Sequence, residues 1–237
     1  MASLKWRLFS VLDPFVRKVI SYYIHDLALQ REWKAAAESA SLIDREMAGA
    51  PALPSRNELL DAALSRVSVE GMYLEFGVYK GETINFLAGK IGGRAIHGFD
   101  SFEGLPESWR DKFAPGKFDL GGRLPPVQSN VTLHAGWFNE TLPKFAEEHK
   151  GPIAFLHLDC VLYSSTKCVF DIIGDRLQTG SVIVFDEFFN YPDWQLGEYK
   201  ALQELCALHS LTFEYIGYNP IGEQAAVVIR RSGQGRA

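Results

Sequence analysis

Short apolar runs alternate with helical patterns from Met72 onward, and this alternation constrains the fold of the 237-residue chain more than any other feature. A short, continuous apolar run bounded by turn residues is typical of a strand that is buried on both faces. Strands that alternate with helices favour a doubly wound, mostly parallel α/β sheet. The expected strands are residues 72–76, 95–100, 131–134, 153–159 and 182–186.

The end of the chain follows a different pattern. After a predicted helix at 196–209, two further strands are expected at 213–218 and 224–230. The loop between them, residues 219–223, is too short for a crossover, so these two strands form an antiparallel hairpin. We therefore expect an α/β sheet of seven strands, mostly parallel, that ends in an antiparallel hairpin.

The first residues of the chain predict an amphipathic helix. Asp13 is expected to be its N-cap and Pro14 its first helical residue. Apolar side chains then recur at helical spacing and form one face, which we call the N-terminal stripe. The stripe consists of Phe15, Val16, Val19, Ile20, Tyr23, Ile24 and Leu27.

A second helix is predicted at 31–47, and the glycine and prolines of residues 49–54 interrupt the helical pattern. Ser55 and Glu58 then have the spacing of a capping box, which indicates that a new helix begins there. The chain thus divides into a helical extension, residues 1–54, and a main domain, residues 55–237.

The N-terminal stripe has two interpretations. It can dock on its own domain or on a second subunit, which would make the protein a homo-oligomer through its N-terminal helices. It can also lie on a membrane surface, because the first 24 residues are net basic. We favour docking or dimerisation. The basic residues concerned are Lys5, Arg7, Arg17 and Lys18.

The composition of the chain limits the classes of molecule that we expect it to bind. A net charge of −5 gives no overall positive field, so we expect a small-molecule partner and no nucleic acid. The cysteines, Cys160, Cys168 and Cys206, are odd in number and lack CxxC spacing, which argues against a disulfide framework and a zinc site. No run is long enough for a transmembrane segment. We expect a soluble, cytoplasmic protein whose long loop, residues 101–130, forms a lid.

Two glycines lie where the first expected strand turns into a helix. Gly77 and Gly81 are spaced as GxxxG and not as the GxGxxG of dinucleotide enzymes, which favours S-adenosylmethionine (SAM) over NAD. Asp100, at the end of the next strand, can accept hydrogen bonds from both ribose hydroxyls, or it can simply cap the following loop. Trp137 offers a flat surface to adenine or a sulfonium, and core packing explains it equally well.

Five segments together give a specific resemblance. They read YLEFGVYKGETINFLA, HGFDSFEGLPESW, NVTLHAGWFNETLP, HLDCVLYSST and VIVFDEFFNYPDW, and in this order they resemble the macrocin O-methyltransferase family of class I SAM-dependent methyltransferases. The resemblance implies a Rossmann-like sheet with the last strand inserted antiparallel, and SAM as cofactor. The implied cofactor-binding residues are Glu75, Phe76, Gly77, Val78, Gly81, Thr83, Asp100, Ser101, Gly136, Trp137 and Phe138.

The resemblance also implies a metal site at Asp159, Asp186 and Glu187, which follow two neighbouring strands. Carboxylates suit Mg²⁺, which could bind the acceptor and lower the pKa of its attacking hydroxyl. Asp159 is the first candidate for the general base. His157 is a second candidate, although a single histidine in a buried strand is more often a core residue.

One position departs from the pattern. Relatives usually read DCDLYSS, whereas this chain has Val161 in place of the second acid. The leading hypothesis is a Mg²⁺-assisted O-methyltransferase that acts on a hydroxyl of a sugar or another natural product. The alternative is a SAM-binding protein whose catalysis is weakened or lost, because valine can neither ligate a metal nor accept a proton. An NAD-dependent oxidoreductase is disfavoured, since hydride transfer does not need the carboxylates.

Overall fold

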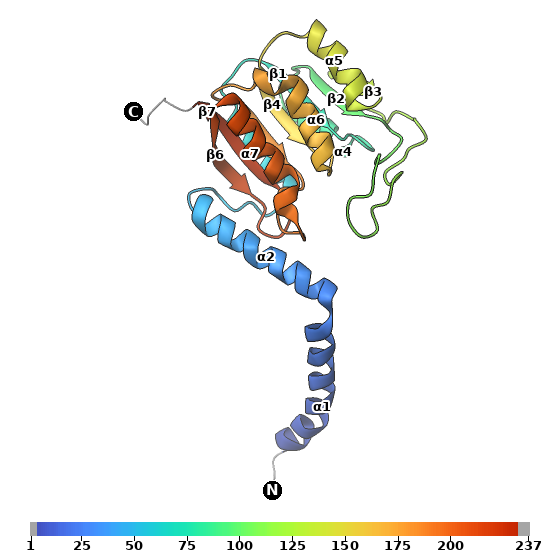
Figure 1. Ribbon diagram of the computed structural model, residues 1–237, viewed down its shortest axis with the longest axis vertical. Coiled ribbons are helices and arrows are strands. Elements are labelled where there is room, and N and C mark those ends of the chain that lie inside the picture. Colours follow the sequence, from blue (N-terminus) through green and yellow to red (C-terminus); the bar gives the residue numbers. More distant parts are fainter. Residues whose placement is uncertain (1–3, 232–237) are drawn as a thin grey trace.

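A seven-stranded sheet forms the centre of the molecule. The computed structural model describes residues 4–231, and the surroundings of side chains for residues 13–230. The strand order is β3-β2-β1-β4-β5-β7-β6 (Figure 1). The strands are β1 (Met72–Phe76), β2 (Ile96–Asp100), β3 (Val131–Ala135), β4 (Ile153–Leu158), β5 (Val182–Phe185), β6 (Leu211–Tyr218) and β7 (Ala225–Arg231).

The pairing of these strands confirms the predicted fold class. β1 to β5 pair in parallel, whereas β7 is antiparallel to both of its neighbours, β5 and β6. β7 thus inserts between β5 and the edge strand β6. All six side chains of β4 are buried, which explains why its sequence, IAFLHL, is a nearly continuous apolar run.

Helices cover both faces of the sheet and produce two separate cores. One core lies under α3 and α4, and the other lies under α5, α6 and α7, the three helices in front of the sheet in Figure 1. Successive strand residues alternate between the cores: Leu156 belongs to one and Phe155 to the other. The helices are α1 (Leu4–His25), α2 (Leu27–Glu46), α3 (Arg56–Leu64), α4 (Glu82–Lys90), α5 (Phe138–Glu148), α6 (Tyr163–Ile173) and α7 (Glu198–His209), with short 3₁₀ turns η1 (Gly174–Arg176) and η2 (Trp194–Leu196).

The predicted start of the first helix is wrong. α1 already begins at Leu4, and Pro14 lies inside it and not in its first turn. Proline lacks the amide that a helix interior uses, but the loss is limited to that position and the helix continues through it. Asp13 is therefore not an N-cap; its carboxylate pairs with Arg17 one turn later, at 2.7 Å.

α1 extends away from the body of the molecule, as Figure 1 shows. Its stripe is open to solvent: Phe15 is 67% exposed and Leu27 is 77% exposed. The stripe therefore does not dock on its own domain, and this interpretation is wrong. Contact with a second subunit or with a membrane stays a prediction, and the side chains of Lys5 and Arg7 lie outside the described residues. No helix in the described range is both long and apolar enough to span a bilayer.

The second half of the predicted extension behaves differently from α1. α2 contributes Leu42 to the core under α5 to α7, and Met47, which follows α2, is buried there too. The amide of Asn190 donates a hydrogen bond to Ser39 of α2, at 2.8 Å. The predicted helix start at Ser55 is confirmed, since Ser55 is the N-cap of α3 and accepts a hydrogen bond from the amide of Glu58. The Glu58 carboxylate accepts a hydrogen bond from the Ser55 hydroxyl and not, as in a full capping box, from the Ser55 amide.

Candidate functional site: a cavity at the switch point of the sheet

A cavity of about 730 Å³ opens at the carboxyl ends of the parallel strands. The strand order reverses direction at β1, with β2 on one side and β4 on the other, and ligands of open α/β sheets bind at such a reversal. Loops that follow all five parallel strands contribute to the wall. Lining residues from these loops include Gly77, Tyr79, Asp100, Ser101, Trp137, Phe138, Asp159, Val161, Asp186 and Glu187.

Gly77 shapes the turn that follows β1. Its φ is +89°, and a Cβ atom at this position would lie 1.8 Å from the carbonyl oxygen of Asp159. Only glycine fits this close approach of two backbones, so the predicted requirement for glycine is explained. Gly81 has a different function: it is the N-cap of α4, with φ +80°, and it does not line the cavity.

Asp100 holds the glycine turn in place. Its Oδ2 accepts hydrogen bonds from the amides of Val78 and Tyr79, both at 2.8 Å, and its Oδ1 accepts one from Phe102 at 2.7 Å. Asp100 therefore caps the loop that follows β2, as one of the two interpretations predicted. Asp100 also lines the cavity, and a carboxylate has about four acceptor positions, so its role toward ribose hydroxyls stays a prediction.

The other predicted cofactor residues fall into two groups. Ser101, Trp137 and Phe138 line the cavity together with Gly77 and Asp100. Several do not line it: Phe76 is buried in the core, and Glu75 is fully buried behind the wall. For Glu75 this placement argues against direct cofactor contact. The remaining predicted residues outside the lining set are Val78, Gly81, Thr83 and Gly136.

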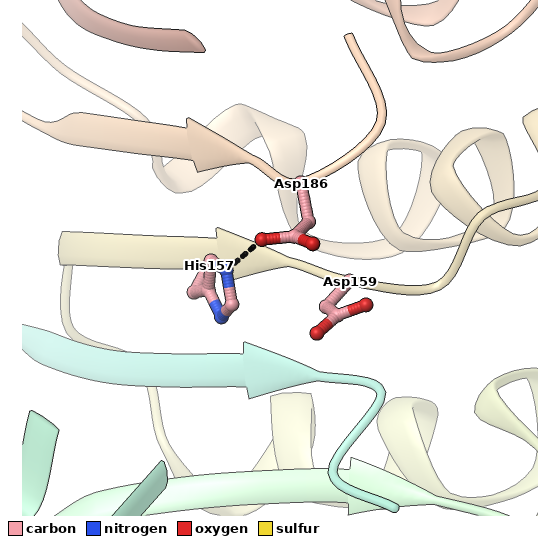
Figure 2. A group of neighbouring side chains, drawn as sticks. All are labelled: His157, Asp159 and Asp186. Atoms are coloured by element: carbon pink, nitrogen blue, oxygen red, sulfur yellow. Dashed lines mark ion pairs between the residues drawn. The ribbon is translucent and has the colours of Figure 1, made fainter. Parts of the chain in front are cut away.

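Two aspartates and a histidine converge beside the predicted cofactor residues. Ligand atoms of His157, Asp159 and Asp186 lie within 4.8 Å of one another, and Figure 2 shows the three side chains at the ends of β4 and β5. The sequence predicted Asp159, Asp186 and Glu187 as metal ligands. Glu187 lines the same cavity but lies outside this group of three.

His157 lies behind the carboxylates and does not line the cavity. Its Nδ1 is 3.0 Å from Oε2 of Glu75, and its Nε2 is 3.7 Å from Oδ1 of Asp186. Burial alone would lower the pKa of His157, but the carboxylates of Asp186 and Glu75 outweigh burial and raise this pKa to about 10. The side chain is fully buried, so this placement supports a positioning role and not the predicted direct catalytic one.

The pKa values of Asp159 and Asp186 shift in opposite directions. Burial and the neighbouring charge of Asp186 raise the pKa of Asp159 well above its usual range, although 26% of the Asp159 side chain stays open to the cavity. Burial would also raise the pKa of Asp186, but the pairing with His157 and Arg56 lowers it. Asp159 is thus the stronger proton acceptor of the pair and the more accessible one.

The residues around the cavity fit a divalent cation. Oδ1 of Asp186 and Oε2 of Glu187 are buried and have no hydrogen-bond partner among the described residues. Burial and the charges of Asp159 and Asp186 raise the pKa of Glu187 well above its usual range. Unsatisfied carboxylate oxygens that repel one another are the donor set that a hard cation such as Mg²⁺ prefers.

Val161 has a backbone conformation that valine rarely adopts. Its φ is +52°, in the left-handed region, and its side chain is 4% exposed at the cavity wall. A β-branched residue is strained there, whereas aspartate and asparagine tolerate this region. The backbone of position 161 therefore suits the acid that the motif resemblance implies there better than it suits valine.

Sequence reasoning missed several residues of the wall. Arg56 reaches the cavity from the start of α3, and the lid, residues 101–130, contributes Trp109, Arg110 and Phe113. The guanidinium of Arg110 lies 3.9 Å from the centre of the Trp109 ring and forms a 2.8 Å ion pair with Glu223. The length and proline content of the lid indicated a function, but no motif identified these side chains.

Comparison with known proteins agrees with this geometry. Residues 74–188 match the family described as "Methyltransferase domain". A curated relative from Streptomyces olivaceus, an 8-demethyl-8-(2,3-dimethoxy-alpha-L-rhamnosyl)-tetracenomycin-C 4'-O-methyltransferase, is 26% identical over an alignment of 183 residues, and the match covers 68% of this chain. The match covers 66% of the relative, so this chain spans just under two thirds of its length.

Solved structures share the fold. The calicheamicin methyltransferase CalS11 superposes with a TM-score of 0.59 at 23% identity, over 82% of this chain and 91% of that one. Its apo structure, described as a TDP-rhamnose 3'-O-methyltransferase, has a TM-score of 0.52 at 25% identity, over 84% and 92%. These matches agree with the resemblance that the five motifs predicted: residues 74–188 match a methyltransferase domain, and the sheet has the fold of solved methyltransferases.

Proposed function

We propose that this chain transfers the methyl group of SAM to a hydroxyl group of a sugar or of a sugar-bearing natural product. The observation that carries the proposal is one continuous cavity, which joins the Gly77 turn and Asp100 to the carboxylates of Asp159 and Asp186. A donor and an acceptor bound at its two ends would meet between them, and such alignment is the main contribution an enzyme makes to a two-substrate transfer.

The cofactor end would bind SAM through its backbone and one aromatic surface. Gly77 lines the cavity at the turn after β1, and Asp100 has acceptor positions left for ribose hydroxyls. Trp137 presents a ring to adenine or to the sulfonium, which a ring face attracts. S-adenosylhomocysteine (SAH) would leave from the same end after the transfer.

At the acceptor end, we propose that Asp159 takes the proton of the attacking hydroxyl. The oxygen forms a bond to the methyl carbon as the carbon–sulfur bond breaks, and the proton ends on the Asp159 carboxylate. His157 holds Asp186 from behind, and Glu75 holds His157. Mg²⁺ bound by Asp159, Asp186 and Glu187 would lower the pKa of the acceptor hydroxyl.

The acceptor class rests on the names of the relatives. One acts on a rhamnosyl-bearing compound and another on TDP-rhamnose, so a deoxysugar hydroxyl is the substrate that we propose. The lid agrees with this choice because it contributes the aromatic residues Trp109 and Phe113 to the cavity wall, and ligand pockets are lined mainly by apolar and aromatic side chains. A small-molecule partner agrees with the net charge of −5.

The alternative function is a SAM-binding protein with weakened or lost catalysis, and one observation favours it. Val161 occupies a cavity position whose left-handed backbone suits an acid, and it offers no proton acceptor. If an acid at this position is the base of the relatives, Asp159 alone does not replace it.

Calorimetry and a transfer assay separate these functions. The full-length chain is titrated with SAM, SAH and NAD, and SAH release is then followed with TDP-deoxysugars and rhamnosides as acceptors. The proposal expects SAM and SAH to bind, NAD not to bind, and Asp159→Asn to abolish turnover while it spares SAM affinity. Binding without turnover that Val161→Asp turns on would establish the alternative, and binding of NAD alone would refute both.

A further inference from the structure

Arg56 extends from the start of α3 into the acidic end of the cavity. The preceding residue, Ser55, is the N-cap of α3, and its hydrogen bonds with Glu58 fix this turn. Nη1 of Arg56 lies 3.5 Å from Oδ2 of Asp159 and 3.5 Å from Oδ2 of Asp186. One guanidinium nitrogen thus bridges carboxylates that follow two different strands.

Arg56 is the cation that faces the cavity at this point. Among the described residues, the basic side chains within 4.0 Å of Asp159 or Asp186 are Arg56 and His157. His157 is fully buried behind the wall, whereas the Arg56 side chain is 34% exposed and lines the cavity. Arginine is always charged, so the carboxylates meet a fixed positive charge from the protein itself.

We propose that Arg56 occupies the cation position between Asp159 and Asp186 and competes there with a divalent metal ion. This inference rests on the proposed function, because it concerns the acceptor end of the same site. A metal ion held by Asp159 and Asp186 would lie next to the guanidinium, and two neighbouring cations repel each other strongly. Metal binding therefore requires Arg56 to leave its place.

The geometry allows Arg56 to leave. Both contacts, at 3.5 Å, are longer than the 2.7–2.9 Å of strong charge-assisted hydrogen bonds, so each is weak. A flexible, one-third exposed side chain can turn toward solvent without disturbing the α3 backbone. Once Arg56 has turned away, Oε2 of Glu187, which has no hydrogen-bond partner among the described residues, is also available to the metal ion.

The test is a titration of the metal-free, full-length chain with MgCl₂ in a calorimeter. Arg56→Gln removes the charge and should bind Mg²⁺ at least roughly tenfold more tightly than the original chain, since a neighbouring unit charge no longer opposes the ion. Arg56→Lys keeps the charge and should stay within about threefold of the original affinity. Arg110→Gln is the matched control, because Arg110 is a cavity arginine of similar exposure, 32%, whose partner is Glu223. Its Mg²⁺ affinity should be unchanged.

Several results would overturn the proposal. Arg56→Gln could bind Mg²⁺ no more tightly than the original chain, or not at all. Arg56→Lys could gain as much as Arg56→Gln, which would exclude the charge as the cause. Arg110→Gln could gain equally, which would indicate an effect of overall charge.

A second measurement uses the unchanged chain and does not depend on the folding of Arg56→Gln. The Nε–H signal of Arg56 is assigned by NMR from its absence in Arg56→Lys, and it should move on addition of Mg²⁺ while that of Arg110 does not. A signal that stays in place at saturating Mg²⁺ contradicts the competition. SAH binding is measured on the same samples, so loss of the proposed function is recognised separately from loss of the competition.

Discussion

Two groups of histidines in the same sheet have opposite properties. His157 lies between Glu75 and Asp186 in the middle of the sheet, and these carboxylates raise its pKa to about 10 against the effect of burial. At the β2–β3 edge, His97, His134 and His149 form what we call the edge histidine cluster. Here burial and the other two histidines lower the pKa of His97 to about 4.

The difference lies in the neighbours and not in the residue type. Nδ1 of His97 is 3.1 Å from Nε2 of His134, and its ring packs against Phe145 with the ring centres 4.9 Å apart. Among the described residues no carboxylate forms an ion pair with His97, and the edge histidine cluster packs between the sheet and α5. Around His157 the acids outnumber the bases, and this excess of negative charge at a cavity marks a functional site.

The largest expected effect comes from removing the central histidine. His157→Leu leaves Glu75 and Asp186 facing each other without the imidazole, and we expect the unfolding free energy to fall by about 3–5 kcal/mol. His97→Leu, the matched control, should lower it by only about 1 kcal/mol, because one hydrogen bond is lost and no charge is stranded. Urea denaturation of both variants checks this. Equal losses would show that the two groups of histidines are equivalent.

The alkaline side of the stability profile should depend on His157. Its folded-state pKa of about 10 lies above the ordinary 6.5, so its stabilising contribution is complete below pH 6.5 and disappears as the pH rises to about 10. The raised pKa of Asp159 acts in the same direction. We expect the metal-free chain to lose a few kcal/mol of unfolding free energy over this range. Denaturation from pH 6 to pH 10 should give a flatter profile for His157→Leu, and an unchanged slope would contradict the assignment.

The acidic side should depend on the edge histidine cluster. The folded-state pKa of His97, about 4, lies below 6.5, so its contribution is present above pH 6.5 and is lost as the pH falls to about 4. The ring is partly exposed, and screening by solvent limits the loss to the order of 1 kcal/mol. His97→Phe should remove this part of the acid dependence in denaturation between pH 7 and pH 4. If the unfolding free energy of His97→Phe falls with pH as steeply as that of the original chain, the acid dependence comes from other groups.

The smallest effect is expected from a region that touches neither group of histidines. Deletion of residues 1–25 removes α1, whose described stripe is exposed, and should change the unfolding free energy by less than about 0.5 kcal/mol. The dependence of the unfolding free energy on pH should not change on the acidic or on the alkaline side. Light scattering on the same samples tests the predicted homo-oligomer, which should dissociate when the stripe is removed. A persistent oligomer would exclude the stripe as its interface.

The strands could be predicted from the sequence because both faces of the sheet are covered. Burial on both sides makes β4 and β5 nearly continuous apolar runs, and the predicted bounds of β1 agree with the structure while those of β4 differ by one residue. The start of α1 could not be predicted in this way, since proline is commonest in a first turn and Pro14 is an exception.

The site was predictable only where its residues lie in local motifs. Gly77, Asp100 and the acids after β4 and β5 follow strand ends, and the cavity contains them. The pairing of Glu75 with His157 depends on the register of β1 against β4, which places these two residues side by side and which no local pattern reveals. Arg56 was missed for a similar reason: an arginine in the first turn of a helix looks like an ordinary surface residue until the neighbouring strand ends are known.

The lid has a consequence for how such proteins diversify. One part of the cavity wall comes from residues at the ends of five separate strands. Another part comes from one continuous segment, residues 101–130, which is linked to the β6–β7 loop by the ion pair between Arg110 and Glu223. A substitution at one of the strand ends must be compatible with the packing of the whole sheet. Under the proposed function, substitutions within residues 101–130 would change the acceptor without altering the strand ends that carry Asp159 and Asp186.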